Sequence, residues 1–136
     1  MERRILYVLT IVLISALALS GAIYAVARDK PKSTTEEESK KLAEDFVRNS
    51  ATYRFDGYSL KHSETLYPDL VDKPYLWTFV FEFESDHAGY GDRSGKDVAQ
   101  VITPHEAHVT VDTGRVNSAI LDMKWDMLEQ KPIETE

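Results

Sequence analysis

The chain contains one cluster of side chains with metal-ligand chemistry: His87, His105 and His108, with Glu106 and Asp92. His105 and His108 are three residues apart, a spacing that shares a face on a helix but lies on opposite faces of a strand. This stretch reads as a strand, so the two rings would converge only if the backbone bulged. A metal-dependent or hydrolytic enzyme that uses the three histidines is therefore an alternative hypothesis for the function.

A glycine-rich stretch, residues 85–95, is the second candidate site. Its glycines permit positive φ, but their spacing matches neither a dinucleotide fingerprint nor a phosphate loop. Tyr90 offers a stacking face and Arg93 a planar fork for a carboxylate. We predict that these two residues, with His87 and Asp92, bind a ligand or partner. The alternative is a wide hairpin loop in which Asp92 and Arg93 pair with each other.

The sequence shows no convergent catalytic set. Ser85 and Ser94 lack the strand–turn–helix context of a nucleophile elbow, and the carboxylates are scattered. There is no cysteine, which excludes disulfides, thiolate metal sites and cysteine nucleophiles. We expect a non-enzymatic protein without a cofactor; were it an enzyme, His87, Asp92 and Arg93 would be the candidates.

The element that must position these loops is an aromatic strand over residues 75–84. Its residues alternate between an apolar face and a face turned towards water, where Glu82 and Glu84 lie. An aromatic face of this size needs a second layer to cover it. The apolar face carries Tyr75, Trp77, Phe79, Phe81 and Phe83.

An amphipathic helix from Glu36 to Asn49 is the predicted cover. Thr35 and Glu38 have the spacing of a capping box, and the acidic first turn suits the helix dipole. The apolar stripe repeats at helical spacing through Ser39, Leu42, Ala43, Phe46, Val47 and Ser50.

The remaining patterns predict further strands. We expect a turn at residues 55–57, a strand over 58–67, a mostly buried strand over 97–103 broken by Pro104, and a hairpin of 107–111 with 115–122. Gly114 suits the left-handed position of a three-residue hairpin loop. The predicted fold is α+β: one helix on a curved antiparallel sheet of four to five strands, spanning residues 35–128, with a polar tail at 129–136.

Residues 1–27 precede this domain as a membrane anchor or a signal segment. Residues 5–27 carry no charge and are long enough to cross a bilayer, and Arg3 and Arg4 favour a cytoplasmic amino end. Cleavage after Ala27 would release the domain instead. Either way the domain, joined through a linker at 28–34, is expected outside the cytoplasmic membrane.

The formal net charge of −7 argues against a nucleic-acid partner, which requires a basic face. The partners we expect are membrane lipid, through residues 5–27, and a protein or peptide.

A helix followed by a curled antiparallel sheet that ends in residues 108–116, His-Val-Thr-Val-Asp-Thr-Gly-Arg-Val, resembles the PepSY-like and cystatin-like small domains. The element order is similar from Thr35 to Met127, and the motif covers the final hairpin. Segments 79–83, 87–93 and 124–127 also look like those of uncharacterised archaeal and bacterial membrane-anchored proteins. The resemblance implies an α+β domain that is secreted or tethered, and some members are thought to restrain peptidases.

These observations favour a membrane-anchored extracytoplasmic binding or regulatory module. Besides the enzyme, a purely structural subunit of a membrane complex is a further alternative.

Overall fold

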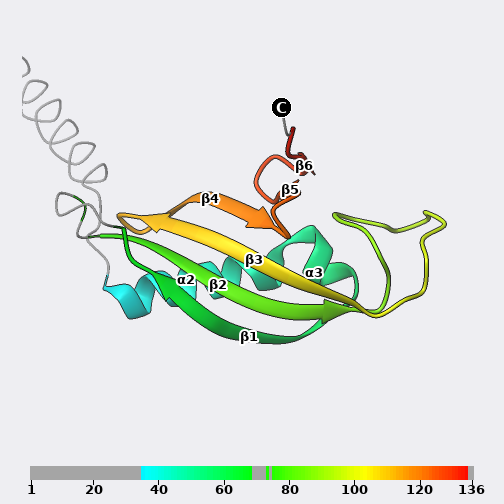
Figure 1. The fold of residues 1–136 in the computed structure, drawn as a ribbon, viewed down its shortest axis with the longest axis horizontal. Coiled ribbons are helices and arrows are strands. Elements are labelled where there is room, and N and C mark those ends of the chain that lie inside the picture. Colours follow the sequence, from blue (N-terminus) through cyan, green and yellow to red (C-terminus); the bar gives the residue numbers. More distant parts are fainter. Residues whose placement is uncertain (1–34, 69–72, 74, 135–136) are drawn as a thin grey trace, which may run out of the picture. The chain divides into compact units, whose positions relative to one another are not determined.

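The computed structural model describes residues 35–68, 73 and 75–134. These residues form an α+β domain in which two helices lie against a six-stranded antiparallel sheet of order β1-β2-β3-β4-β5-β6 (Figure 1). The α+β class is as predicted, but the sheet has six strands and not four or five, and a second helix is present. In the described part of the chain, neither helix is long and apolar enough to cross a membrane. The predicted span, residues 5–27, lies outside the described residues.

The first helix, α2, spans Glu36–Asn49 as predicted. Thr35 Oγ1 accepts a hydrogen bond from the Glu38 backbone, and Glu38 returns one to the Thr35 N–H, so the predicted capping box is present. Its buried residues, Ser39, Ala43 and Val47, are spaced four apart. Leu42, predicted in the stripe, is exposed instead. The small side chains of Ser39 and Ala43 let α2 lie close to the sheet. The buried face of α2 is therefore narrower than the predicted stripe.

A second helix, α3, spans Ala51–Asp56 where we predicted a turn at residues 55–57. Ser50 ends α2 and begins α3 in an extended conformation, so the chain bends there without leaving the helical layer. Gly57 then starts β1. A Cβ at this position would lie 2.6 Å from the Tyr53 ring, so the step from α3 to β1 requires glycine.

The three long strands of the sheet are β1 (Gly57–Leu66), β2 (Leu76–Ser85) and β3 (Thr103–Asp112). β2 is central, with β1 and β3 as antiparallel neighbours. The register between β2 and β3 is continuous, and Pro104 pairs opposite Glu84 within it, so the predicted break at Pro104 is wrong. Proline is tolerated there because it is close to the strand start.

The core lies between the helices and one face of the sheet (Figure 1). Trp77, Phe79, Phe81 and Phe83 are buried on that face, which confirms the predicted aromatic face of the strand, but Val80 on the opposite face is buried too. Tyr75, which we placed with them, is exposed at the strand's start. Packing each large side chain out of water contributes about 1.5–3 kcal/mol, so this row of rings contributes substantially to the stability of the domain.

Residues 86–102 form a long connection between β2 and β3 and contain no strand. The strand predicted over 97–103 is therefore wrong, and Val101 and Ile102 are exposed. Local alternation is insufficient for a strand when no neighbour supplies the hydrogen bonds. The connection leaves the end of the sheet opposite to the start of α2 (Figure 1).

The hairpin of β3 with β4 (Arg115–Leu121) is confirmed. Its loop has two residues, Thr113 and Gly114, and not the predicted three, and both have positive φ as a type I′ turn requires. Short strands β5 (Trp125–Asp126) and β6 (Lys131–Pro132) extend the sheet beyond β4. The polar segment after Leu128 thus contributes a strand that the sequence pattern does not predict.

Candidate functional site

A chain of hydrogen bonds links Ser85, His105 and Asp122 where β2 ends and β3 begins. Ser85 Oγ lies 3.0 Å from His105 Nε2, and His105 Nδ1 lies 2.7 Å from Asp122 Oδ2. Asp122 follows β4 and also accepts the backbone N–H of Glu106 at 2.7 Å. Burial raises the pKa of Asp122, but the hydrogen bonds from His105 and Glu106 outweigh it and hold that pKa below its usual value.

These three residues have the order of a serine–histidine–aspartate triad, but the serine is placed for structure and not for attack. The Ser85 side chain is fully buried, with 0% exposure. Its hydroxyl donates to the backbone carbonyl of His87 at 2.8 Å, which directs its hydrogen away from His105. A nucleophile needs the opposite arrangement, an accessible oxygen whose hydrogen points to the base.

Tyr90 covers this buried chain of hydrogen bonds from the glycine-rich stretch. Its ring stacks on Trp125, with centroids 5.6 Å apart and planes 11° from parallel, and also contacts His105. Burial, together with the charge and hydrogen bond of Asp122, raises the pKa of Tyr90 to about 12. The predicted stacking face of Tyr90 is thus occupied by a residue of the same domain.

Arg93 and His87 meet at a carboxylate that the sequence analysis did not single out, Asp56 at the end of α3. Arg93 Nη2 donates to Asp56 Oδ1, and His87 Nδ1 lies 2.8 Å from Asp56 Oδ2. The Arg93 side chain is 2% exposed; it also donates to the Gly89 carbonyl at 2.7 Å and lies over the Phe55 ring. The guanidinium thus fastens the glycine-rich stretch to α3.

Asp92, the fourth predicted binding residue, is exposed and does not pair with Arg93. Its Oδ1 accepts the backbone N–H of Ser94 at 2.9 Å, and hydrogen bonds from Ser94 lower the pKa of Asp92. The structure therefore brings His87 and Arg93 together on Asp56, places Tyr90 against Trp125, and leaves Asp92 apart on the surface.

The three histidines of the metal hypothesis have separate partners: His87 contacts Asp56, His105 contacts Asp122, and His108 contacts Glu106. His105 is buried on the helix side of β3, while His108 lies on the opposite face, as the odd spacing predicts. Within residues 35–68, 73 and 75–134, no three His, Asp or Glu side chains are grouped closely enough to hold a metal ion.

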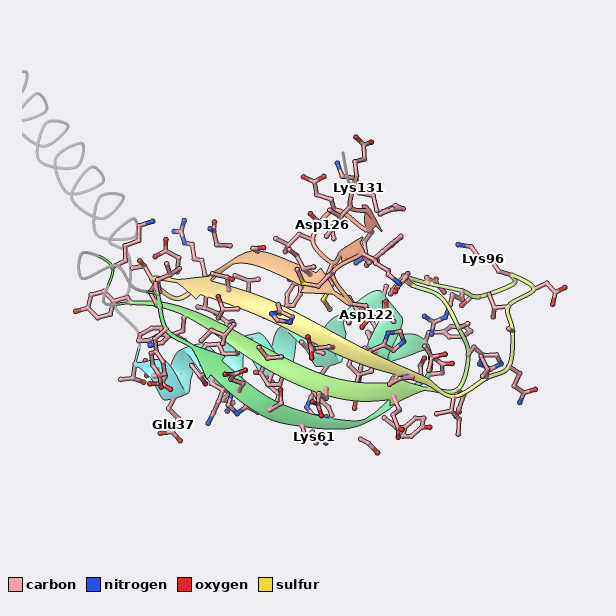
Figure 2. The ribbon with its side chains drawn as sticks, in the orientation of Figure 1. Glu37, Lys61, Lys96, Asp122, Asp126 and Lys131 are labelled. Carbon is pink, nitrogen blue, oxygen red and sulfur yellow. The ribbon has the colours of Figure 1, made fainter. Side chains whose placement is uncertain are left out.

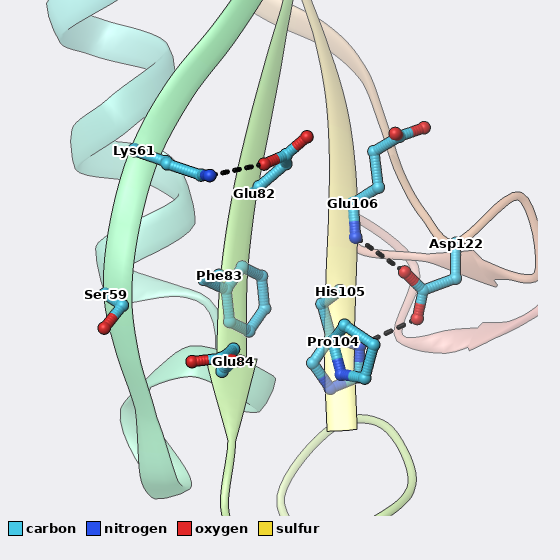
Figure 3. Close-up of a pocket in the computed structure, with 9 residues that line it drawn as sticks. All are labelled: Ser59, Lys61, Glu82, Phe83, Glu84, Pro104, His105, Glu106 and Asp122. Carbon is cyan, nitrogen blue, oxygen red and sulfur yellow. Dashed lines mark hydrogen bonds and ion pairs between the residues drawn. The ribbon is translucent and has the colours of Figure 1, made fainter. Parts of the chain in front are cut away.

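A groove of about 470 Å³ lies on the sheet face turned away from the helices (Figure 3). Its walls come from three adjacent strands and from Asp122, and Pro104 supplies apolar surface. Lys61 Nζ bridges to Glu82 Oε2 at 2.9 Å across one wall. The lining is Ser59, Lys61, Glu82, Phe83, Glu84, Pro104, His105, Glu106 and Asp122.

The charge of the groove is strongly negative, since four carboxylates face a single ammonium group. The sequence offered part of this signal, because period-two alternation puts Glu82 and Glu84 on the face away from the aromatic rings. It offered no signal for Asp122, which reaches the groove from the turn after β4 (Figure 3). Comparisons of the chain with protein-family models, with curated proteins and with solved structures find no match.

Proposed function

We propose that this protein is a membrane-anchored extracytoplasmic binding module, without enzymatic activity, that holds a positively charged segment of a protein or peptide partner. The observation that carries the proposal is the groove on the open face of the sheet. It offers apolar surface at Pro104 beside several carboxylates, a mixture suited to a long side chain with a cationic end.

The negative charge of the groove favours a positively charged partner. Lys61 already places an ammonium group 2.9 Å from Glu82, so the site accommodates a cation of this size. Glu106 and Asp122 pair with His108 and His105, which orients their carboxylates along the groove. Complementary charge speeds association and rejects acidic partners, so a lysine- or arginine-containing segment is the ligand class.

The buried residues of the domain support binding over catalysis. Ser85 is inaccessible, and the candidate binding residues Tyr90 and Arg93 are engaged within the domain. Their role is to hold the glycine-rich stretch against α3 and Trp125, which keeps the edge of the groove at His105 and Asp122 in place.

The location rests on the uncharged segment 5–27, which is long enough to span a bilayer. Five basic residues precede Thr35 and only Glu2 and Asp29 oppose them, so the domain is more acidic than the net charge of −7 for the whole chain. The resemblance to PepSY-like domains favours a peptidase or another protein as the partner. Sequencing the mature amino terminus of protein from cells distinguishes a tether from release after Ala27.

The groove is tested with the full-length protein in phosphatidylcholine vesicles and a fluorescent peptide of alternating lysine and serine, followed by anisotropy. We expect Glu82→Gln with Glu106→Gln to weaken binding about tenfold or more, the equivalent of about 1.4 kcal/mol. The matched control, Glu37→Gln with Asp97→Asn, removes the same charge from exposed positions outside the groove. If both double variants weakened peptide binding equally, the peptide would be attracted by the overall negative charge of the domain, which would contradict a binding site in the groove.

A further inference from the structure

The end of the domain where α2 begins carries the exposed aromatic side chains. Among the Phe, Trp and Tyr residues that the structure describes, only Tyr67 and Tyr75 are exposed, at 64% and 43%. Leu66 beside them is exposed too. All other described aromatic rings are buried or half-buried, so the two tyrosines stand out against the rest of the domain.

Hydrogen bonds join these residues to the start of α2 and to the β3–β4 hairpin. Tyr67 Oη donates to Glu36 Oε1 at 2.9 Å, and the backbone carbonyl of Tyr75 accepts the N–H of Thr113 at 3.0 Å. Leu66 pairs opposite Thr78 near the start of β2. Leu66, Tyr67 and Tyr75 therefore lie at one end of the domain, here called the tyrosine end, next to the residue through which the chain enters the domain.

The length of chain ahead of Thr35 limits how far this end can lie from a bilayer. Residues 28–34 separate the uncharged segment from Thr35, and seven residues fully extended reach about 25 Å at most. Tyrosine favours the headgroup region of a bilayer, because its ring is apolar and its hydroxyl is polar. A tethered domain thus presents an interfacial side-chain type at the end nearest its tether.

We propose that the tyrosine end docks on the lipid headgroups of the membrane that anchors the chain, so that the domain stands on the bilayer with its strands pointing outward. This rests on the anchoring part of the proposed function. Glu84 and Pro104, which line the groove, pair with each other near the end of β2 and the start of β3. This is the end of the sheet away from the tyrosine end. From Leu76 to Glu84 the strand rises about 25 Å, so docking would hold the groove clear of the headgroups.

The chain has no cysteine, which permits single-site labelling of the full-length protein. Glu37→Cys marks the end where α2 begins and Lys96→Cys marks the opposite end; both positions are exposed, and Figure 2 labels both residues. Each variant is labelled with an NBD fluorophore and reconstituted in phosphatidylcholine vesicles containing headgroup-nitroxide lipid. We expect nitroxide quenching at position 37 to exceed that at position 96 by at least about threefold.

A second pair of variants isolates the tyrosines. Tyr67→Ser with Tyr75→Ser, added to Glu37→Cys, should reduce the quenching to near that of position 96, while Val101→Ser with Ile102→Ser should leave it unchanged. Equal quenching at both positions, or stronger quenching at position 96, would overturn the docking. If the protein does not float with the vesicles at all, the anchor itself is wrong, which separates failure of the proposed function from failure of this inference.

Discussion

Arg93 donates a hydrogen bond to Asp56 across 37 positions of sequence, from a side chain that is almost wholly buried. Phe55 supports the same guanidinium through its ring, 4.7 Å away. In the described part of the chain, Arg93 Nε is one of two buried side-chain nitrogens without a hydrogen-bond partner. The pair holds the glycine-rich stretch on α3 together with two further contacts, His87 Nδ1 to Asp56 Oδ2 at 2.8 Å and the Gly91 N–H to Thr52 Oγ1 at 2.8 Å.

Removal of Asp56 should destabilise the domain strongly, because it leaves a buried guanidinium without its counter-charge. We expect Asp56→Ala to cost about 3–5 kcal/mol of unfolding free energy. Arg93→Met combined with Asp56→Ala should recover part of that loss. Thermal unfolding of the full-length protein in detergent, followed by near-ultraviolet circular dichroism, measures both. A double variant no more stable than Asp56→Ala alone would contradict the ion-pair account.

Gly91 and Gly95 form a matched pair for testing close packing. Both have φ of +72°, but a Cβ at Gly91 would lie 3.2 Å from Trp125 Cζ2, whereas a Cβ at Gly95 meets nothing within 4 Å. We expect Gly95→Ala to cost about 1–2 kcal/mol for its backbone conformation alone. Gly91→Ala should cost more and alter the Trp125 emission through its stacking on Tyr90. If Gly91→Ala and Gly95→Ala lowered the unfolding free energy equally, the Trp125 ring would be able to move away from the added methyl group without cost.

Asp122 should make stability depend on pH in the acid range. Its pKa is lower in the folded protein than in the unfolded chain, so its stabilising contribution is present above about pH 4 and is lost as pH falls through the folded pKa. Asp122→Asn lacks this contribution. The stability gap between wild type and Asp122→Asn should therefore narrow from pH 5 to pH 2.5, and exposed Asp97→Asn serves as the matched control. A stability difference between wild type and Asp122→Asn that stays constant over this pH range would contradict a lowered pKa for Asp122.

Tyr90 should ionise only at high pH, because its pKa is raised to about 12 by burial and by Asp122. Because the pKa of Tyr90 is higher in the folded protein than in the unfolded chain, the protonated phenol favours folding. Its contribution to stability is complete below about pH 10 and is lost as pH rises through about 12. Absorbance at about 295 nm should show a late step that Tyr90→Phe removes. Persistence of the step in Tyr90→Phe would assign it to another phenol.

The local elements of this domain follow from the sequence. The Thr35–Glu38 capping box, the helix to Asn49 and the alternation of Trp77 to Phe83 are written in neighbouring residues. Each is set by hydrogen bonds or side-chain periods that span a few positions, so each can be recognised without knowledge of distant parts of the chain. The opposite facing of His105 and His108 follows from the same period of two.

Tertiary structure alone decided which side chains meet. The sequence predicts Arg93 as a binding residue, whereas in the structure Arg93 pairs with Asp56. The sequence also predicts a buried strand at Val101 and Ile102, but these residues are exposed and pair with no strand. The groove unites Lys61, Glu82, Glu106 and Asp122 from four segments, and only strand register aligns them. A sequence pattern specifies the face on which a residue lies, whereas its partner is set by long-range pairing that no local period encodes.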